Sequence, residues 1–127
     1  MTASNPCLLL VEDDPLVRDT VALLLEEEGY AVVEAPNAGH ALDLVRNGLD
    51  TRLIVTDVDL GPGPSGADLA DELHRLRPEL SIIFITGRIT SLLGRARDAR
   101  EAILPKPFEI CTLAEMVKRM TSRGEAT

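Results

Sequence analysis

Reactive side chains stand directly after four short apolar segments of this chain. They are Glu12, Asp13 and Asp14 after 8–11, Asp57 after 53–56, Thr86 after 82–85, and Lys106 after 103–105. If the four segments are parallel strands, their carboxyl ends lie at one edge of the sheet, where ligands bind in open α/β folds. That edge would collect several carboxylates, one hydroxyl and one ammonium group. The set predicts a site for a divalent cation and a phosphoryl group.

Each of these groups has a role in such a site. Glu12, Asp13 and Asp57 would repel one another at short range, and Mg²⁺ relieves this repulsion by binding a few carboxylates, a backbone carbonyl and waters. Thr86 and Lys106 have no role in a purely structural metal site. They can, however, bind two oxygens of a phosphoryl group while the metal binds the third. Asp57 is then placed to attack phosphorus and form an aspartyl phosphate.

Taken one at a time, the same residues have simpler explanations. Asp14 is expected to be the N-cap of a helix, and Glu12 and Asp13 alone could be solvated loop charges. Thr86 alone is more simply a strand-end residue. Their joint occurrence, each set at the end of its own apolar segment, favours the functional interpretation.

The segments that must position these residues show the pattern of an α/β domain. The apolar segments lack alternation, which is typical of strands buried on both faces. Between them we expect helices from Pro15 to Gly29, from Asn37 to about Gly48, from Ser65 to just before Pro78, more weakly over 89–100, and over 113–120, with a further strand over 31–34. Strand and helix alternate throughout. This order predicts a doubly wound, five-stranded parallel sheet with helices on both faces.

Length, composition and charge count against several classes of function. The 127 residues fit a single domain, with a core over about 6–121 and a frayed tail over 121–127. A net charge of −8 and only three aromatic residues count against direct nucleic-acid binding. No apolar stretch approaches the roughly 20 residues that span a bilayer, and the amino terminus lacks the features of a signal peptide. Cys7 and Cys111 are isolated thiols, so we expect a cytoplasmic domain without membrane contact.

Four motifs resemble those of a known family, the receiver domains of bacterial two-component response regulators. The motifs lie at 9–15 (LLVEDDP), 55–60 (VTDVDL), 85–87 (ITG) and 104–108 (LPKPF), with the spacing of that family. The resemblance implies a flavodoxin-like (βα)₅ fold that receives a phosphoryl group on Asp57 from a phosphohistidine. The implied partners are a sensor histidine kinase or a histidine phosphotransfer protein and an unknown downstream protein, with a homodimer left open. Catalysis would be limited to the chain's own phosphorylation and dephosphorylation, and we expect a receiver without an output domain.

The resemblance also implies individual roles. Asp13 and Asp57 bind Mg²⁺ directly, Glu12 acts through water, and the Asp59 backbone carbonyl completes the metal shell. Thr86 and Lys106 then sense the phosphoryl group on Asp57, the acceptor.

Two departures from the family pattern stand out. Gly61 delays the usual Pro-Gly pair by one residue, so that the loop over the site is expected to sit differently. Ile103 stands where much of the family has an aromatic residue that swings inward on activation. The route by which activation is transmitted is therefore left open.

Two other functions fit part of the sequence. Asp57-Val58-Asp59 resembles the first motif of haloacid-dehalogenase-type phosphatases, with Asp57 as the nucleophile. Against this, the acidic pair precedes the nucleophile strand, and no residues are left for a cap over the substrate. The other alternative is a receiver-like interaction module that is not phosphorylated. Ile103 favours this alternative, and the complete set of acceptor, metal and sensing residues counts against it.

Overall fold

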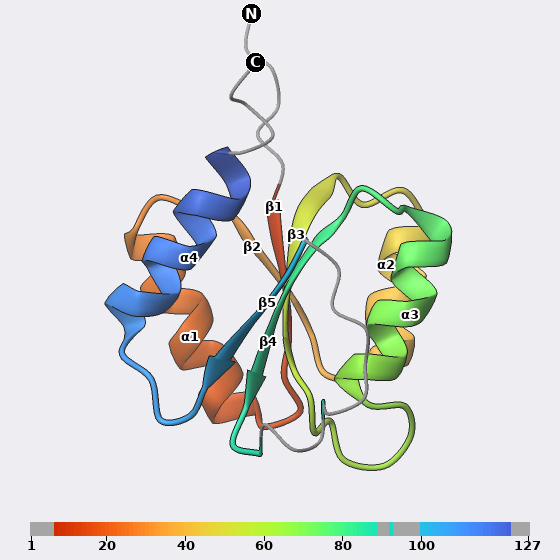
Figure 1. Ribbon diagram of the computed structural model, residues 1–127, viewed down its shortest axis with the longest axis horizontal. Helices are drawn as coiled ribbons and strands as arrows, with labels where there is room; N and C mark the ends of the chain where they lie inside the picture. Colours follow the sequence, from red (N-terminus) through yellow and green to blue (C-terminus); the bar gives the residue numbers. More distant parts are fainter. Residues whose placement is uncertain (1–6, 89–91, 93–99, 123–127) are drawn as a thin grey trace, which may run out of the picture.

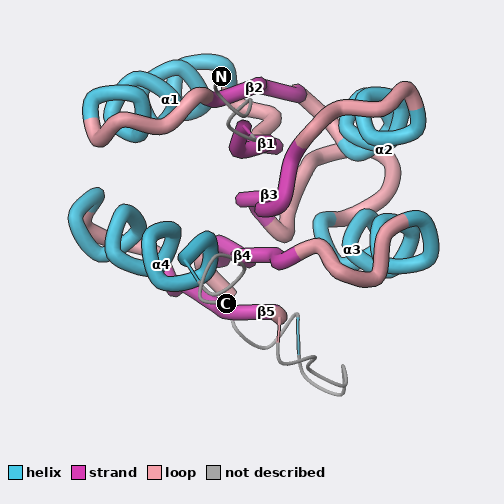
Figure 2. The backbone as a smooth tube through the Cα atoms, turned by 90° about the horizontal axis from the view of Figure 1, so that it is seen from above, coloured by secondary structure: helices cyan, strands magenta, loops and turns pink. Residues whose placement is uncertain are grey.

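Five parallel strands form one sheet in the computed structural model, which describes residues 7–88, 92 and 100–122. The strands are β1 (Cys7–Val11), β2 (Val32–Ala35), β3 (Thr51–Asp57), β4 (Ser81–Thr86) and β5 (Glu101–Pro105), in the order β2-β1-β3-β4-β5. The helices are α1 (Pro15–Glu27), α2 (Ala38–Arg46), α3 (Gly66–Leu76) and α4 (Ile110–Ser122). Helices α1 and α4 cover one face, and α2 and α3 cover the other (Figures 1 and 2). The predicted doubly wound α/β fold is confirmed.

Two apolar cores, one on each face of the sheet, explain why the strands lack alternation. On one face Leu9, Ile54 and Phe84 pack with residues of α2 and α3 such as Val45 and Leu73. The opposite face carries the alternate strand residues, among them Leu10, Val55 and Ile83, which pack with Leu25 of α1 and Leu113 of α4. Burial of one such side chain stabilises the fold by about 1.5–3 kcal/mol. Both faces of the central strands must therefore be apolar.

Side-chain caps begin the helices near the residues that the sequence indicated. Asp14 Oδ1 accepts hydrogen bonds from the backbone N–H groups of Leu16 (2.9 Å) and Val17 (3.3 Å), and Pro15 occupies the first turn. Ser65 and Asp68 form a reciprocal capping box at the start of α3, with both hydrogen bonds at 3.1 Å. These caps fix where the loops end at the carboxyl edge of the sheet.

Several predicted details were wrong. The last helix starts at Ile110 and runs to Ser122, so the frayed tail cannot begin at Thr121. Ile110 and Met120 both pack against the core, and Thr121 Oγ1 donates to the Val117 carbonyl at 2.8 Å, which extends the helix at both ends. The helix expected over 89–100 lies outside the described residues, except for positions 92 and 100.

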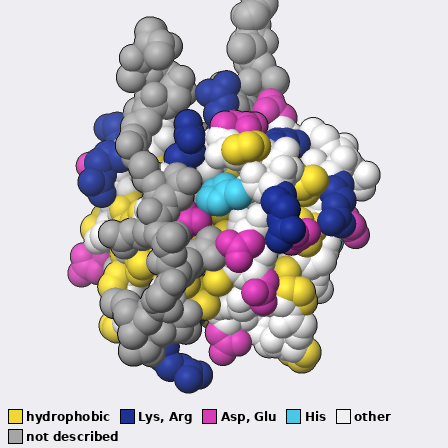
Figure 3. All heavy atoms as spheres, turned by 45° about the vertical axis from the view of Figure 1, so that its right-hand side comes forward, with side chains coloured by type: hydrophobic (Ala, Val, Ile, Leu, Met, Phe, Trp, Pro, Cys, Tyr) yellow, Lys and Arg dark blue, Asp and Glu magenta, His cyan; other side chains and the backbone are white. Residues whose placement is uncertain are grey.

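The surface shown in Figure 3 carries Lys and Arg side chains interspersed with Asp and Glu, and its visible described part has no continuous basic strip. This agrees with the net charge of −8. Among the described residues, no helix is long and apolar enough to cross a membrane.

Candidate functional site

The carboxyl ends of the strands open into a cleft of about 790 Å³. Parallel register puts these ends side by side: Val11 pairs with Thr56, Asp57 with Ile85, and Thr86 with Pro105. The cleft is lined by Glu12, Asp13, Asp14, Val17, Asp57, Val58, Asp59, Gly61, Ser65, Thr86, Gly87, Arg88 and Lys106. The structure therefore brings together every side chain that the sequence placed in the site.

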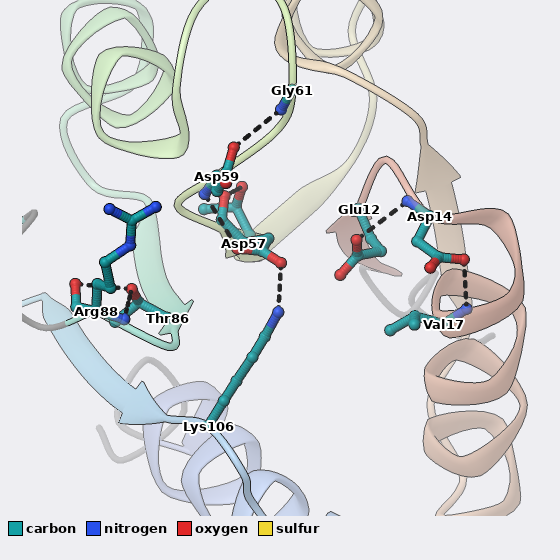
Figure 4. A network of polar contacts seen from close by, with 10 residues as sticks. Glu12, Asp14, Val17, Asp57, Asp59, Gly61, Thr86, Arg88 and Lys106 are labelled. Atoms are coloured by element: carbon teal, nitrogen blue, oxygen red, sulfur yellow. Dashed lines mark hydrogen bonds and ion pairs between the residues drawn. The ribbon is translucent and has the colours of Figure 1, made fainter.

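Asp57 lies at the centre of the cleft with both carboxylate oxygens engaged (Figure 4). It is the last residue of β3 and is 7% exposed. Lys106 reaches across from the end of β5, and its Nζ donates to Asp57 Oδ2 at 2.7 Å. The Asp59 backbone N–H donates to Oδ1 at 3.0 Å. A charged, hydrogen-bonded carboxylate on a rigid strand end is a suitable nucleophile.

Gly66, the first residue of α3, allows the close approach that sets this position. A Cβ atom at Gly66 would clash with the Asp57 carbonyl oxygen, well inside van der Waals contact. The Gly66 N–H also donates to the Val58 carbonyl at 2.8 Å. Residue types alone did not indicate this contact. The only signal was a glycine directly after the Ser65 cap, which is common at helix starts for other reasons.

The acidic loop, residues 12–14 after β1, faces Asp57. Glu12 is 8% exposed, and its Oε2 accepts a hydrogen bond from the Asp14 N–H at 3.1 Å. Its own N–H donates to the Ala35 carbonyl of β2 at 3.1 Å. Asp13 is exposed to the cleft, so its carboxylate is accessible to a ligand.

Gly61, the extra loop residue noted in the sequence, lies against the acidic loop. Its φ is +77°, and a Cβ atom there would lie 3.1 Å from Asp13 Oδ2. The Gly61 N–H donates to Asp59 Oδ1 at 3.2 Å, which closes the loop after β3. Glycine at 61 therefore meets both a backbone requirement and a space requirement beside Asp13.

Charge is concentrated at the cleft. Burial, together with the neighbouring Asp57 charge, raises the pKa of Glu12 to about 7, although the hydrogen bond from the Asp14 N–H opposes the shift. Burial lowers the pKa of Lys106, but the hydrogen bond to Asp57 and the charges of Asp57, Glu12 and Asp13 outweigh it, so that the pKa is raised. Lys106 thus stays protonated, and a further cation would relieve the remaining repulsion.

Thr86 lines the cleft, but its hydroxyl is held by its own loop. It is 4% exposed, and Oγ1 accepts from the Arg88 N–H and donates to the Arg88 carbonyl, both at 2.9 Å. The Lys106 N–H donates to the Thr86 carbonyl at 2.8 Å, which ties the two strand ends together. A phosphoryl group bound in the cleft would have to draw the hydroxyl away from Arg88.

Ile103 is not among the residues that line the cleft. It pairs with Phe84 in the sheet and is half-buried against the core beneath α2 and α3. An aliphatic side chain packed there has no polar tip to take into water.

The donor set fits Mg²⁺ rather than an all-protein metal cage. Within the described part of the chain, no three His, Cys, Asp or Glu side chains are placed to hold a metal by themselves. Mg²⁺ usually keeps several waters and binds through one or two carboxylates. Asp13, Asp57 and Asp59 line the same cleft, so that they could offer donors of that kind.

The amino-acid sequence matches the response regulator receiver domain family over residues 8–118. The chain belongs to this family. It is 34% identical over 126 residues to the sensor kinase CckA of Brucella abortus (strain 2308), covering 97% of this chain and 13% of CckA. The receiver domain spans about half the length, or less, of the curated relatives that it matches.

Solved receiver structures share the fold. A CheY-like receiver domain protein of Methanospirillum hungatei JF-1 superposes with a TM-score of 0.83 at 31% identity, covering 96% of this chain and 98% of that one. The response regulator TrrA of Thermotoga maritima, in complex with Mg²⁺ and BeF, gives 0.82 at 28% identity, covering 91% and 99%. Receiver domains are signalling domains of two-component systems, and the family match is therefore to receivers and not to haloacid-dehalogenase-type phosphatases.

Proposed function

We propose that this receiver domain accepts a phosphoryl group on Asp57 in a Mg²⁺-dependent reaction. One observation carries the proposal: Lys106 Nζ lies 2.7 Å from Asp57 Oδ2 inside a cleft that also holds Asp13, Asp59 and Thr86. A nucleophilic carboxylate, a fixed positive charge and a hydroxyl donor are the protein groups that phosphoryl transfer needs. The complex of TrrA with Mg²⁺ and BeF supports a metal-dependent site in this chain as well.

The transfer starts from a phosphohistidine. An Asp57 carboxylate oxygen forms a bond to phosphorus as the bond from phosphorus to the donor imidazole nitrogen breaks, and the electron pair of that bond remains on the imidazole. Asp13, Asp57 and the Asp59 carbonyl would hold Mg²⁺, with Glu12 acting through water. The metal, when bound, neutralises charge on the phosphoryl oxygens.

The two sensing residues act after the transfer. Lys106 must leave Asp57 Oδ2 to bind a phosphoryl oxygen, and the Thr86 hydroxyl must leave the Arg88 backbone to bind another. Both exchanges displace residues at the ends of β4 and β5. These two strand ends move together because the Lys106 N–H donates a hydrogen bond to the Thr86 carbonyl. The resulting change at this end of the sheet is the signal to a downstream protein.

The phosphoryl donor is a sensor histidine kinase or a histidine phosphotransfer protein that docks beside the cleft. Leu16 and Leu23, seven positions apart on α1, are 75% and 56% exposed. Val17, 40% exposed, lines the cleft itself, so this apolar face of α1 is continuous with the site. Leu16→Asp should slow transfer from any phosphohistidine protein that serves the wild-type chain and leave labelling by acetyl phosphate unchanged. Equal slowing with both donors would contradict docking on α1.

Intact-mass spectrometry after incubation with Mg²⁺ and acetyl phosphate tests the central proposal. The wild-type chain should gain the mass of one phosphoryl group, and Asp57→Asn should abolish the gain. Asp59→Asn is the matched control, because only the backbone carbonyl of Asp59 is assigned to the metal and Asn can still accept from Gly61. No gain in the wild-type chain would identify an interaction module that is not phosphorylated, and an undiminished gain in Asp57→Asn would refute Asp57 as the acceptor.

A further inference from the structure

Arg18 joins three elements that meet beside the site. It lies in the second turn of α1, and its Nη1 donates to the Glu12 backbone carbonyl at 2.9 Å. Its Nε donates to Glu34 Oε1 of β2 at 3.3 Å. We propose that Arg18 is a positioning residue, which sets the Mg²⁺ affinity of the site by holding the peptide between Glu12 and Asp13. This inference rests on the proposed function, because it assigns a role to Asp13 in metal binding.

The geometry of the peptide links Arg18 to Asp13. The Glu12 carbonyl belongs to the planar peptide unit that ends at the Asp13 Cα. A hydrogen bond that fixes the direction of the Glu12 carbonyl therefore also fixes the plane of this peptide unit and the position of the Asp13 Cα. On its other side, Glu12 is held by the N–H donated to Ala35. Because the peptide groups on both sides of Glu12 are hydrogen-bonded, the chain that follows β1 has a fixed direction at Asp13, toward the cleft.

Glu34 keeps the guanidinium in the orientation that this bond needs. It pairs with Leu10 in the register of β1 and β2, one position before Ala35. The Arg18 side chain is 18% exposed and that of Glu34 is 36% exposed, so the ion pair is only partly screened by solvent. The planar fork of Arg donates in two directions at once, whereas a Lys ammonium is a single point charge on a flexible stem. The arrangement therefore requires Arg in particular.

A simple charge effect would act in the opposite direction. A positive charge close to a cation site weakens cation binding, so removal of that charge should tighten Mg²⁺ binding. Loss of a residue that orients a metal ligand should instead weaken binding, typically by about tenfold or more. The sign of the change thus separates positioning from electrostatics.

Isothermal titration with Mg²⁺ on the full chain, below the unfolding temperature of every variant, tests the inference. Arg18→Gln should bind Mg²⁺ about tenfold more weakly than wild type. Arg18→Lys, which keeps the charge but loses the fork, should also bind more weakly. Glu34→Gln should stay close to wild type, because the Gln Oε1 can still accept from Arg18 Nε. Arg75→Gln is the matched control, since Arg75 is exposed on α3 and forms an ion pair with Glu72 of the same helix.

The possible results are distinct. Equal or tighter binding in Arg18→Gln would overturn the inference, as would an equal loss in Arg75→Gln. If Arg18→Gln does not fold, Arg18→Lys decides, and an unchanged affinity in that variant overturns the inference. If the wild-type chain itself binds no Mg²⁺, the proposed function fails, and this result is separate from any effect of Arg18.

Discussion

The two halves of the cleft are built differently. The acidic half, residues 12–14 and Asp57, is anchored by the fold: Glu12 is held through its N–H, its carbonyl and its carboxylate, each by a different partner. In the responding half, Thr86 and Lys106, the side-chain donors bond to protein groups that a phosphoryl group could replace. The acidic half is therefore preorganised for the proposed metal, whereas the side chains of the responding half would exchange partners on the proposed phosphorylation.

The two halves match two different requirements of a phosphorylation site, namely chemistry and signalling. Metal binding and nucleophilic attack need carboxylates in fixed positions, since misplacement of a ligand costs affinity directly. A signal needs groups whose bonds differ between two states. Lys106, with a side chain 39% exposed, and Thr86, bonded to its own loop, meet that need.

The largest expected effect comes from removal of the exposed carboxylate of the anchored half. Asp13→Ala should lose most of the stabilisation that Mg²⁺ confers, which for wild type reaches about 2.7 kcal/mol at a hundredfold excess over Kd. Thermal unfolding with increasing Mg²⁺ measures it. Asp14→Ala is the control: loss of the N-cap should cost about 1 kcal/mol of stability but leave the Mg²⁺ response intact. A normal Mg²⁺ response in Asp13→Ala would show that Asp13 does not bind the metal.

Gly66→Ala tests the packing that positions Asp57. The added Cβ meets the Asp57 carbonyl, so we expect a loss of about 1–3 kcal/mol in the free energy of unfolding. Gly39→Ala, in α2, is the matched control because its Cβ would make only an ordinary contact of 3.5 Å with Asn37. That variant should be unchanged or more stable by up to about 1 kcal/mol. Denaturant unfolding of both variants checks the difference, and equal stabilities would argue against the close approach at Gly66.

Glu12→Gln tests the concentration of charge in the anchored half. Because the pKa of Glu12 rises from 4.5 to about 7 on folding, the folded chain binds more protons there than the unfolded chain between these values. The contribution of Glu12 to stability therefore falls as pH rises through this window. Without Mg²⁺, Glu12→Gln should gain stability relative to wild type by on the order of 1 kcal/mol from pH 4.5 to 7.

Chemical unfolding across this pH range measures the effect. Glu27→Gln provides the control for the loss of one carboxylate at an exposed position. If the difference between Glu12→Gln and wild type does not grow with pH, the carboxylate is not destabilised by its surroundings.

The smallest expected effect concerns the mouth of the responding half. Asp59 and Arg88 line the same cleft as Asp57, and Arg88 follows Thr86 by two residues. Arg88→Ala should open the path of the hydrolytic water and shorten the aspartyl-phosphate lifetime, by tenfold for each 1.4 kcal/mol of barrier lost. Mg²⁺ affinity should barely change. A lifetime equal to or longer than that of wild type would mean that Arg88 does not shield the phosphoryl group.

Features that depend on local interactions or on a simple burial pattern could be predicted from the sequence, whereas features that depend on loop conformation could not. The strands and their terminal residues were predictable because apolar segments buried on both faces have few alternatives, and parallel register brings their ends together. Helix starts at Asp14 and Ser65 were predictable because capping is a local interaction. The contact of Gly66 with Asp57, the fork of Arg18 and the bond from Thr86 to Arg88 were missed, because each depends on loop conformations that residue types alone do not determine.

Identification of the phosphorylated residue most directly tests the proposal that Asp57 accepts the phosphoryl group. After incubation with Mg²⁺ and acetyl phosphate, borohydride reduction converts an aspartyl phosphate to homoserine, and peptide mass spectrometry then locates the altered residue. We expect homoserine at position 57, in a yield that depends on Mg²⁺ and that falls in Asp13→Ala. Homoserine at Asp13 or Asp59, or none at any position, would contradict it.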